Sequence, residues 1–456
     1  MQPKPNTSGI CAGRLSAEQV QKNFGDSHAP LNRVQALIEA ERCYYCYDAP
    51  CITACPTGID IPTFIQRIAQ DNVRGAAHSI LDENILGGMC ARVCPTEVLC
   101  EQACVRNTNE DKPVEIGLLQ RFATDHYLAV PGVPLFTRAA DSGKKVAVVG
   151  AGPAGLACAH RLAMLGHSVV LFEARPKLGG LNEYGLAAYK TVHDFAQSEI
   201  DWLLSIGGIE VKTNMALGRD MVLDSLARDF DAVFLGVGLV GVNSLGINQP
   251  TATGVQDAVA FIAALRQSND LTQLPIGRHV VVIGGGMTAV DAAVQSKKLG
   301  AEHVTIVYRR GEEAMSASEY EQDWAKRNSV TVRHWAAPKE VLCEGGAVRG
   351  VRFAYTHLVG GKLAETGETF ALQADMVFKA IGQTFDAAPV GASIELTNGR
   401  IRTNENGRTS QARIWAGGDC REGGRDLTVE AVEHGKRAAI SIDDVLRASL
   451  SAKPPA

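Results

Sequence analysis

The pattern of hydrophobic and polar positions changes near residue 144. Before it, short apolar segments recur at the three- and four-residue spacing of helices, as at 61–69 and 117–123. After it, runs of consecutive apolar residues end in glycine and lead into helical patterns, first at 145–149 and again at 278–283. Such runs are typical of buried parallel strands. We therefore predict a mainly helical N-terminal domain followed by an α/β region.

The α/β region contains two strand–glycine–helix units, which begin at Gly150 and Gly284. A late segment, 414–419, has the character of a strand that rejoins the first unit. We expect two Rossmann-like dinucleotide-binding domains, the second nested within the first. The expected boundaries are 1–140 for the helical domain, 141–255 and 375–456 for the two parts of the first nucleotide-binding domain, and 256–374 for the second. A linker is expected at 131–143.

Composition narrows the class of protein. The 456 residues are 46% hydrophobic and carry a net charge of −5, which argues against nucleic acid or an anionic membrane surface as a partner. No run of about 18 apolar residues is present, and the N-terminus lacks the apolar stretch of a signal peptide. We expect a cytoplasmic location, where twelve cysteines are better explained as metal ligands than as disulfides.

Eight of the cysteines occur in two closely spaced runs between residues 43 and 104. They are Cys43, Cys46, Cys51, Cys55, Cys90, Cys94, Cys100 and Cys104. Thiolates at this spacing can hold iron–sulfur clusters, and proline after Cys55 and Cys94 is typical of ferredoxin-like loops. Zinc is the alternative metal, but zinc carries no electrons. Because two nucleotide fingerprints follow in the same chain, we favour iron–sulfur, with the cysteines divided into two groups of four.

The first glycine motif predicts a dinucleotide site. It consists of Gly150, Gly152, Pro153, Ala154 and Gly155. The glycines allow a tight turn, a close approach to a pyrophosphate and close packing of the helix on the strand. The N-terminus of that helix would then face the phosphates.

Five further positions indicate which dinucleotide is bound. Glu173 ends the next predicted strand, where a carboxylate can bind ribose hydroxyls. Gly180, Gly418 and Asp419 resemble the pattern of FAD-binding flavoproteins, and Thr428 begins a helix whose N-terminus would face the flavin ring. The alternative for Asp419 is a helix cap or a turn.

The second glycine motif predicts a nicotinamide site built from Gly284, Gly286, Thr288 and Asp291. The next predicted strand ends in Arg309 and Arg310, which could clamp the 2′-phosphate of NADP. Two glutamates follow at 312 and 313 and would oppose a phosphate. A solvated loop or a platform for adenine is the alternative for the arginines, so these residues leave the choice of NAD or NADP open.

Taken together, these motifs resemble the electron-input module shared by dihydropyrimidine dehydrogenase and the glutamate synthase small subunit. The resemblance extends over about 30–445. The segments 48–51, 55–61 and 116–120 are more similar to dihydropyrimidine dehydrogenase, in which one cluster takes three cysteines and a glutamine; the glutamate synthase relative has glutamate at that position. Here the position is occupied by Gln120.

The resemblance implies two 4Fe-4S clusters with specific ligands. The first would be held by Cys43, Cys46, Cys51 and Gln120, and the second by Cys55, Cys94, Cys100 and Cys104. This differs from the simple division of eight cysteines, because it leaves Cys90 without a cluster.

The resemblance also implies a function. We expect the electron-input subunit of a dihydropyrimidine dehydrogenase, with NADH (or NADPH, NAD being preferred) as donor, FAD and two 4Fe-4S clusters as carriers, and a separate FMN-containing subunit that reduces uracil or thymine. No catalytic side chain is expected, since the cofactors carry the chemistry. The alternatives are a glutamate synthase small subunit or related reductase subunit, and a redox sensor without turnover. A disulfide reductase is disfavoured, because neither nucleotide domain contains a Cys-x2-Cys pair.

Overall fold

The computed structural model describes residues 9–130, 134–247 and 252–451. Part of the expected linker, residues 131–133, lies outside the described residues. The chain divides into two compact units. One unit comprises Met1–Ser27, Tyr184–Val192 and Gly241–Thr384, and the other comprises His28–Glu183, His193–Val240 and Phe385–Ala456.

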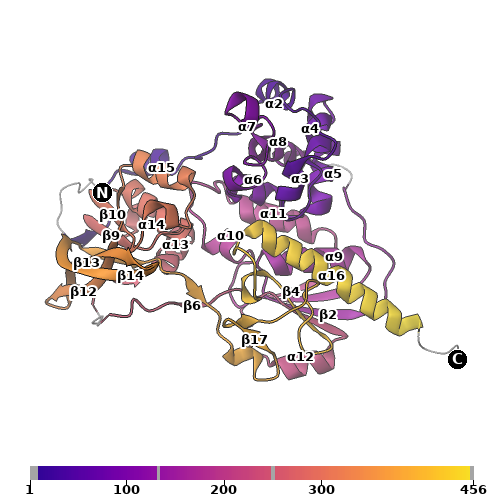
Figure 1. The fold of residues 1–456 in the computed structure, drawn as a ribbon. Helices are drawn as coiled ribbons and strands as arrows, with labels where there is room; N and C mark the ends of the chain where they lie inside the picture. Colours follow the sequence, from indigo (N-terminus) through magenta and orange to yellow (C-terminus); the bar gives the residue numbers. More distant parts are fainter. Residues whose placement is uncertain (1–8, 131–133, 248–251, 452–456) are drawn as a thin grey trace. The chain divides into compact units, whose positions relative to one another are not determined.

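The helical N-terminal domain belongs to the second unit (Figure 1). Its helices are α2 (Arg33–Ala40), α3 (Pro50–Ala54), α4 (Ile61–Ala69), α5 (Val73–Glu83), α6 (Gly87–Val93), α7 (Asn107–Glu110) and α8 (Ile116–Ala129). Helix α4 begins where the Asp60 side chain accepts the Thr63 N–H, and Pro62 occupies its first turn. Its Phe64 packs with Ile80 of α5 and Leu119 of α8 in a core that is nearly free of solvent.

The rest of the second unit contains a parallel five-stranded sheet, in the order β19-β5-β2-β3-β4. The strands are β2 (Lys145–Val149), β3 (Ser168–Phe172), β4 (Ile209–Lys212), β5 (Ala232–Leu235) and β19 (Ile414–Ala416). Helices α9 (Pro153–Met164), α11 (Phe195–Leu204), α12 (Leu223–Asp229) and the long C-terminal α16 (Thr428–Ser451) accompany it, with the short α10 (Leu181–Tyr184) between β3 and α11. Helix α16 packs closely on α9, where a Cβ on Gly435 would lie 2.1 Å from the Ala154 carbonyl oxygen.

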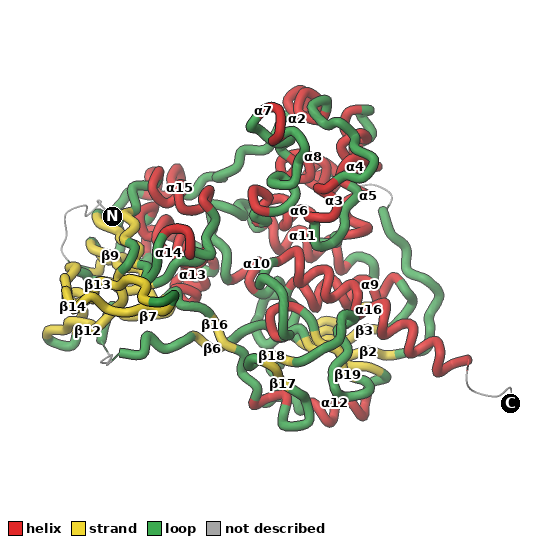
Figure 2. The backbone as a smooth tube through the Cα atoms, viewed as in Figure 1, coloured by secondary structure: helices red, strands yellow, loops and turns green. Residues whose placement is uncertain are grey.

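The first unit contains a second parallel sheet, in the order β11-β10-β9-β15-β7. Its strands are β7 (Val255–Asp257), β9 (His279–Ile283), β10 (His303–Val307), β11 (Thr331–Arg333) and β15 (Met376–Lys379), and its helices are α13 (Ala258–Arg266), α14 (Met287–Lys298) and α15 (Glu319–Arg327). Figure 2 shows the separate antiparallel sheet of β12 (Ala336–Glu344), β13 (Ala347–Val359) and β14 (Lys362–Gln373) in the same unit. Near the N-terminus, β1 (Ile10–Cys11) pairs with β8 (Ile276–Gly277).

The chain order of the strands shows the nesting. Strand β19 belongs to the sheet of β2, although in the sequence it follows all strands of the other unit. The prediction of a helical domain followed by two nested Rossmann-like domains is therefore confirmed. Within the described residues, no helix has the length and apolar character needed to cross a membrane.

Candidate functional site

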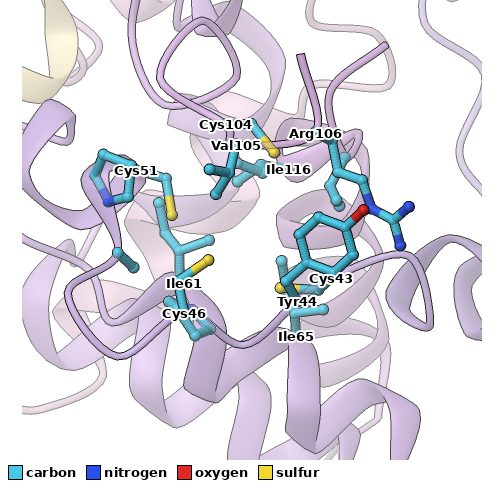
Figure 3. Close-up of a pocket in the computed structure, with 14 residues that line it drawn as sticks. Cys43, Tyr44, Cys46, Cys51, Ile61, Ile65, Cys104, Val105, Arg106 and Ile116 are labelled. Carbon is cyan, nitrogen blue, oxygen red and sulfur yellow. The ribbon is translucent and has the colours of Figure 1, made fainter. Parts of the chain in front are cut away.

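Four of the eight clustered cysteines line one cavity in the helical domain (Figure 3). Cys43 and Cys46 lie on the loop after α2, Cys51 lies in the first turn of α3, and Cys104 lies on the loop before α7. Apolar side chains that include Ile61 complete the wall of the cavity. The cavity thus offers four thiols in an apolar environment.

Arg106, two residues after Cys104, holds the loop of Cys104 at this cavity. The Arg106 guanidinium lies over the Tyr44 ring, 3.9 Å from its centroid, and Arg106 also donates to the Arg42 carbonyl. These contacts fold the loop back onto the segment that carries Cys43. The arrangement differs from the expected one, in which Cys104 belonged to the second group and Gln120 to the first.

The remaining four cysteines form a second group around α6. Cys55 ends α3, Cys90 lies within α6, and Cys94 follows the last residue of α6. Cys55, Cys90 and Cys94 pack with Leu99, and the electrostatic influence of Cys55 and Cys100 on Cys94 indicates that Cys100 is also close. Cys90 is 2% exposed, so it is a buried neighbour of the group.

Gln120 contacts α6, the helix that carries Cys90, and does not line the cavity of Cys43. It is a buried residue of α8, and its Nε2 donates to the Gly87 carbonyl at the start of α6, at 2.7 Å. The bond fixes the amide against the helix that carries Cys90. The role of Gln120 as a cluster ligand stays a prediction.

Burial in both groups favours the protonated form of the thiols. Burial, with neighbouring thiols as the lesser cause, raises the pKa of Cys51 to about 12. The pKa of Cys94 is raised by its hydrogen bond with Cys90 and by burial, and the pKa of Cys100 is raised by burial. Free thiols here would stay protonated, whereas a bound metal deprotonates them.

The spacing of the thiols also bears on the metal. Among the described residues, no three His, Cys, Asp or Glu side chains converge as they would around one metal ion. The donors in the two groups are thiols, which are soft ligands of the kind that iron–sulfur clusters take.

The first glycine motif adopts the geometry expected of a dinucleotide site. Gly150 has a φ of +97°, and a Cβ there would lie 2.3 Å from the Gly236 carbonyl oxygen. A Cβ on Gly155 would lie 1.8 Å from the Gly150 oxygen, and one on Gly180 would lie 2.7 Å from the Cα of Gly152. Only glycine permits these approaches. Pro153 and Ala154 form the first turn of α9, whose N-terminus faces the turn.

The acidic residue after β3 is held against this turn. Glu173 is buried, its Oε2 accepts the Ala151 N–H at 2.9 Å, and its Oε1 accepts the Arg175 N–H at 2.9 Å. The carboxylate is therefore fixed at the end of the strand, where a ribose would bind.

Gly418 and Asp419 follow the end of β19 and lie near the first glycine motif. A Cβ on Gly418 would lie 3.1 Å from the Cβ of Ala154, and the Thr428 hydroxyl donates to the Asn182 side chain at 2.8 Å. Burial raises the pKa of the adjacent Asp419 to about 6. The structure therefore gathers Gly418, Asp419 and Thr428 near the first glycine motif.

The second glycine motif has a matching turn between β9 and α14. A Cβ on Gly284 would lie 2.1 Å from the Ala380 oxygen, Gly286 caps α14, and Thr288 lies half-buried in its first turn. Asp291, by contrast, is 2% exposed and is already engaged: its carboxylate lies 2.9 Å from Lys190 Nζ and accepts the Ala187 N–H. That ion pair accounts for its burial.

Arg309 and Arg310 follow β10 with exposed side chains. Their carbonyls accept hydrogen bonds from the Thr356 hydroxyl and the Trp335 N–H, which fix the backbone of the pair. Glu312, which the sequence suggested would oppose a phosphate, forms an ion pair with Lys326 at 2.7 Å. This ion pair neutralises part of the repulsion expected between Glu312 and a phosphate.

Sequence reasoning missed Lys436, a residue of α16 that contacts the first cysteine run. Its Nζ donates to the Thr57 carbonyl at 3.0 Å and lies 2.7 Å from Glu83 and 2.9 Å from Glu433. The Glu433–Lys436 spacing is an ordinary helical pair, so the sequence carried no signal of the contact with residue 57.

Comparison with known proteins identifies both halves of the chain. Residues 20–130 match the family model described as dihydropyrimidine dehydrogenase domain II, 4Fe-4S cluster, and residues 144–435 match pyridine nucleotide-disulphide oxidoreductase. The glutamate synthase [NADPH] small chain of Escherichia coli is 35% identical over 92% of this chain and 93% of its own length. The NAD-dependent dihydropyrimidine dehydrogenase subunit PreT of Salmonella typhimurium is 34% identical over 94% and 99%.

Solved structures support the fold. Thioredoxin reductase of T. acidophilum matches 66% of this chain and 99% of its own with a TM-score of 0.54 at 20% identity. FprA of Mycobacterium tuberculosis in complex with NADPH matches 69% and 87% with a TM-score of 0.56 at 19% identity. The chain is thus an oxidoreductase with a 4Fe-4S domain and a fold that binds FAD and NAD(P), and it belongs to the pyridine nucleotide-disulphide oxidoreductase family.

Proposed function

We propose that this chain is the electron-input subunit of a dihydropyrimidine dehydrogenase, which passes electrons from NADH or NADPH through FAD and two 4Fe-4S clusters to an FMN-containing partner subunit. The partner would reduce uracil or thymine to the 5,6-dihydropyrimidine. The relatives named as dihydropyrimidine dehydrogenase subunits support this proposal, since they match nearly their whole length.

The observation that carries the proposal is the contact between the flavin domain and the second cysteine group. Leu427, just before α16, and Val429, in its first turn, share one hydrophobic cluster with Cys55, Cys90 and Cys94. The N-terminus of α16 also lies beside the proposed flavin site through Thr428 and Asn182. One short segment therefore touches both redox sites, and this proximity is what electron transfer between them requires.

We assign the ligands from the observed groups. Cys43, Cys46, Cys51 and Cys104 would hold one cluster, and Cys55, Cys94 and Cys100 would hold three corners of the other, with Gln120 as the fourth ligand. When bound, FAD accepts a hydride and the clusters carry single electrons.

The side chains of this chain bind and orient those groups. Glu173 holds the turn of the first glycine motif, and the glycines let a pyrophosphate approach the N-terminus of α9. Lys436 holds the loop of Thr57 against α16 and so keeps the first cysteine run in place. We assign no protein acid or base, because the cofactors supply the chemistry.

The test is anaerobic oxidation of NADH and of NADPH by the purified chain with uracil, with and without a candidate FMN subunit. Uracil-dependent oxidation that needs both proteins is the expected result. Cys46→Ala should abolish it, while Cys343→Ala, which removes an exposed cysteine, should not. Oxidation with an artificial dye but never with uracil would reject the pyrimidine substrate and keep the electron-input role.

A second candidate is a glutamate synthase small subunit, favoured by the 35% identity to that chain of Escherichia coli. In that case the purified chain would support NADPH-dependent glutamate formation with a glutamine-cleaving partner and would not respond to uracil. Gln120 favours the first candidate, because the family resemblance places glutamate at this position in glutamate synthase.

A further inference from the structure

A buried carboxyl group of the flavin domain reaches into the helical domain. Glu199 lies on α11 and is 0% exposed. Its Oε1 accepts the Gly88 N–H at 2.7 Å, and both of its oxygens lie 3.2 Å from the Met89 nitrogen and accept its N–H. These N–H groups belong to the first turn of α6, where no partner within the helix is available. Glu199 therefore caps α6 from another domain.

The sequence of α6 makes room for this carboxyl group. A Cβ on Gly88 would lie 2.7 Å from Glu199 Oε1 and 2.6 Å from Cζ of Phe195. A Cβ on the preceding Gly87 would lie 2.5 Å from a methyl group of Ile80. The Gly87–Gly88 pair is thus required by close packing around the cap, although glycine is an unfavourable residue in a helix.

Arg92 completes the attachment one turn further along α6. Its guanidinium lies 3.4 Å from the centroid of the Phe195 ring, donates to the Gly88 carbonyl at 3.0 Å, and pairs with Asp125 of α8 at 2.7 Å. Helices α6, α8 and α11 are thus joined by buried polar contacts. Such contacts are costly unless fully satisfied, so they fix one arrangement of the three helices.

The helix held in this way carries the second cysteine group. Cys90 lies in α6, Cys94 follows its last residue, and Gln120 donates to the carbonyl of Gly87. A displacement of α6 would move these residues together relative to the flavin domain. We propose that Glu199 is a positioning residue for electron transfer between the flavin and the second cluster, holding α6 in register with the flavin domain. The proposal rests on the proposed function.

The experiment compares Glu199→Ala, Glu199→Gln and the control Asp201→Asn, which changes an exposed acid on the same helix. Each purified protein is mixed anaerobically with NADH in a stopped-flow spectrometer, and the reduction of flavin and the subsequent reduction of iron–sulfur are followed separately. Iron content and the electron paramagnetic resonance spectrum of each reduced cluster are measured on the same samples.

We expect Glu199→Ala to retain its iron and to reduce its flavin normally. Transfer to iron–sulfur should slow by about 10- to 100-fold, because a small displacement of groups held for a reaction can cost that much, and the spectrum of one cluster should shift. Glu199→Gln keeps an oxygen that can accept the Gly88 N–H, so it should restore most of the rate. Asp201→Asn should match the wild type.

Wild-type transfer and unchanged spectra in Glu199→Ala would overturn the proposal. If Glu199→Ala does not retain iron, the same measurements are made on Gly88→Ala. Its Cβ would displace the carboxyl group from α6 while leaving Glu199 in the chain. Wild-type transfer in Gly88→Ala would likewise overturn the proposal. Failure of the proposed function would look different: the wild-type chain itself would bind no iron or would not pass electrons to it.

Discussion

The guanidinium of Arg106 lies 3.9 Å from the centroid of the Tyr44 ring, and this contact returns Cys104 to the cavity of Cys43. The two residues are far apart in the chain: Tyr44 directly follows Cys43, and Arg106 lies two residues after Cys104. Their contact determines which thiols face one another, a property that the spacing of cysteines along the sequence does not contain. Figure 3 shows Tyr44 and Arg106 side by side at this cavity.

This grouping predicts how cysteine substitutions combine. Cys46→Ala and Cys104→Ala should each remove about four iron atoms per chain, the content of one 4Fe-4S cluster. The double variant should lose the same four, because both thiols serve one cluster. Cys46→Ala combined with Cys55→Ala should lose about eight. A loss of eight in the first double variant would place Cys104 in the other cluster.

The second group predicts different roles for two neighbouring residues. Gln120→Ala should alter the spectrum of the cluster that also depends on Cys55, since the amide is fixed beside α6, while FAD stays bound. Cys90→Ala should leave about eight iron atoms per chain. Electron paramagnetic resonance and iron analysis of both variants provide the measurement, and loss of about four iron in Cys90→Ala would make Cys90 the ligand.

Much of the fold could be predicted because its signals are local. Buried strands followed by glycine turns and helices identified both nucleotide domains, and helical spacing identified α4 and α8. The antiparallel sheet of β12, β13 and β14 was not predicted, since β14 is mostly exposed and none of the three strands is a continuous apolar run.

The parts of the site that escaped prediction depend on contacts between distant segments. The ion pair of Asp291 with Lys190, about a hundred residues earlier, had no signal in the sequence, and the role of Asp291 in the nicotinamide site stays a prediction. Glu199 carries no sequence signal, because its role depends on the glycine pair at 87 and 88. Local patterns indicate which chemistry is present, whereas the partners of each group follow from the fold.

Glu173 is predicted to govern retention of FAD. Glu173→Ala removes the acceptor of the Ala151 N–H and should loosen the turn that would approach the pyrophosphate. The variant should lose flavin on dilution while its iron content stays unchanged. Glu210→Ala, which alters an exposed carboxylate on β4, is the control. Full flavin occupancy of Glu173→Ala at low FAD concentration would contradict this role.

The exposed arginines predict how the two nicotinamide coenzymes are discriminated. Arg310→Ala should raise the KM for NADPH about tenfold or more and change that for NADH little, since hydrogen bonds to a charged group contribute about 1.5–3 kcal/mol. Lys326→Ala should have a similar but weaker effect by releasing Glu312 from its ion pair. Steady-state kinetics with an artificial acceptor measure both. Equal effects on the two coenzymes would instead favour a platform for adenine.

The burial of Glu199 predicts a dependence of stability on pH. Burial raises the pKa of this carboxyl group from 4.5 to about 8, against the opposing effects of the Gly88 N–H and Arg92. The folded chain therefore binds a proton that the unfolded chain has lost between these two values, so this group makes folding less favourable as pH rises through that window, by about 1.4 kcal/mol for each pH unit.

Glu199→Gln cannot ionise and should escape this loss. The Tm of both proteins is measured anaerobically from pH 5 to pH 9. The Tm of the variant minus that of the wild type should increase with pH and become constant above about pH 8. The charged groups around the site, Arg92, Asp125 and Arg121, are the same in both proteins and cancel in the comparison. Asp201→Asn should follow the wild type. A constant difference in Tm across the range would mean that Glu199 has an ordinary pKa and remains ionised in the folded chain.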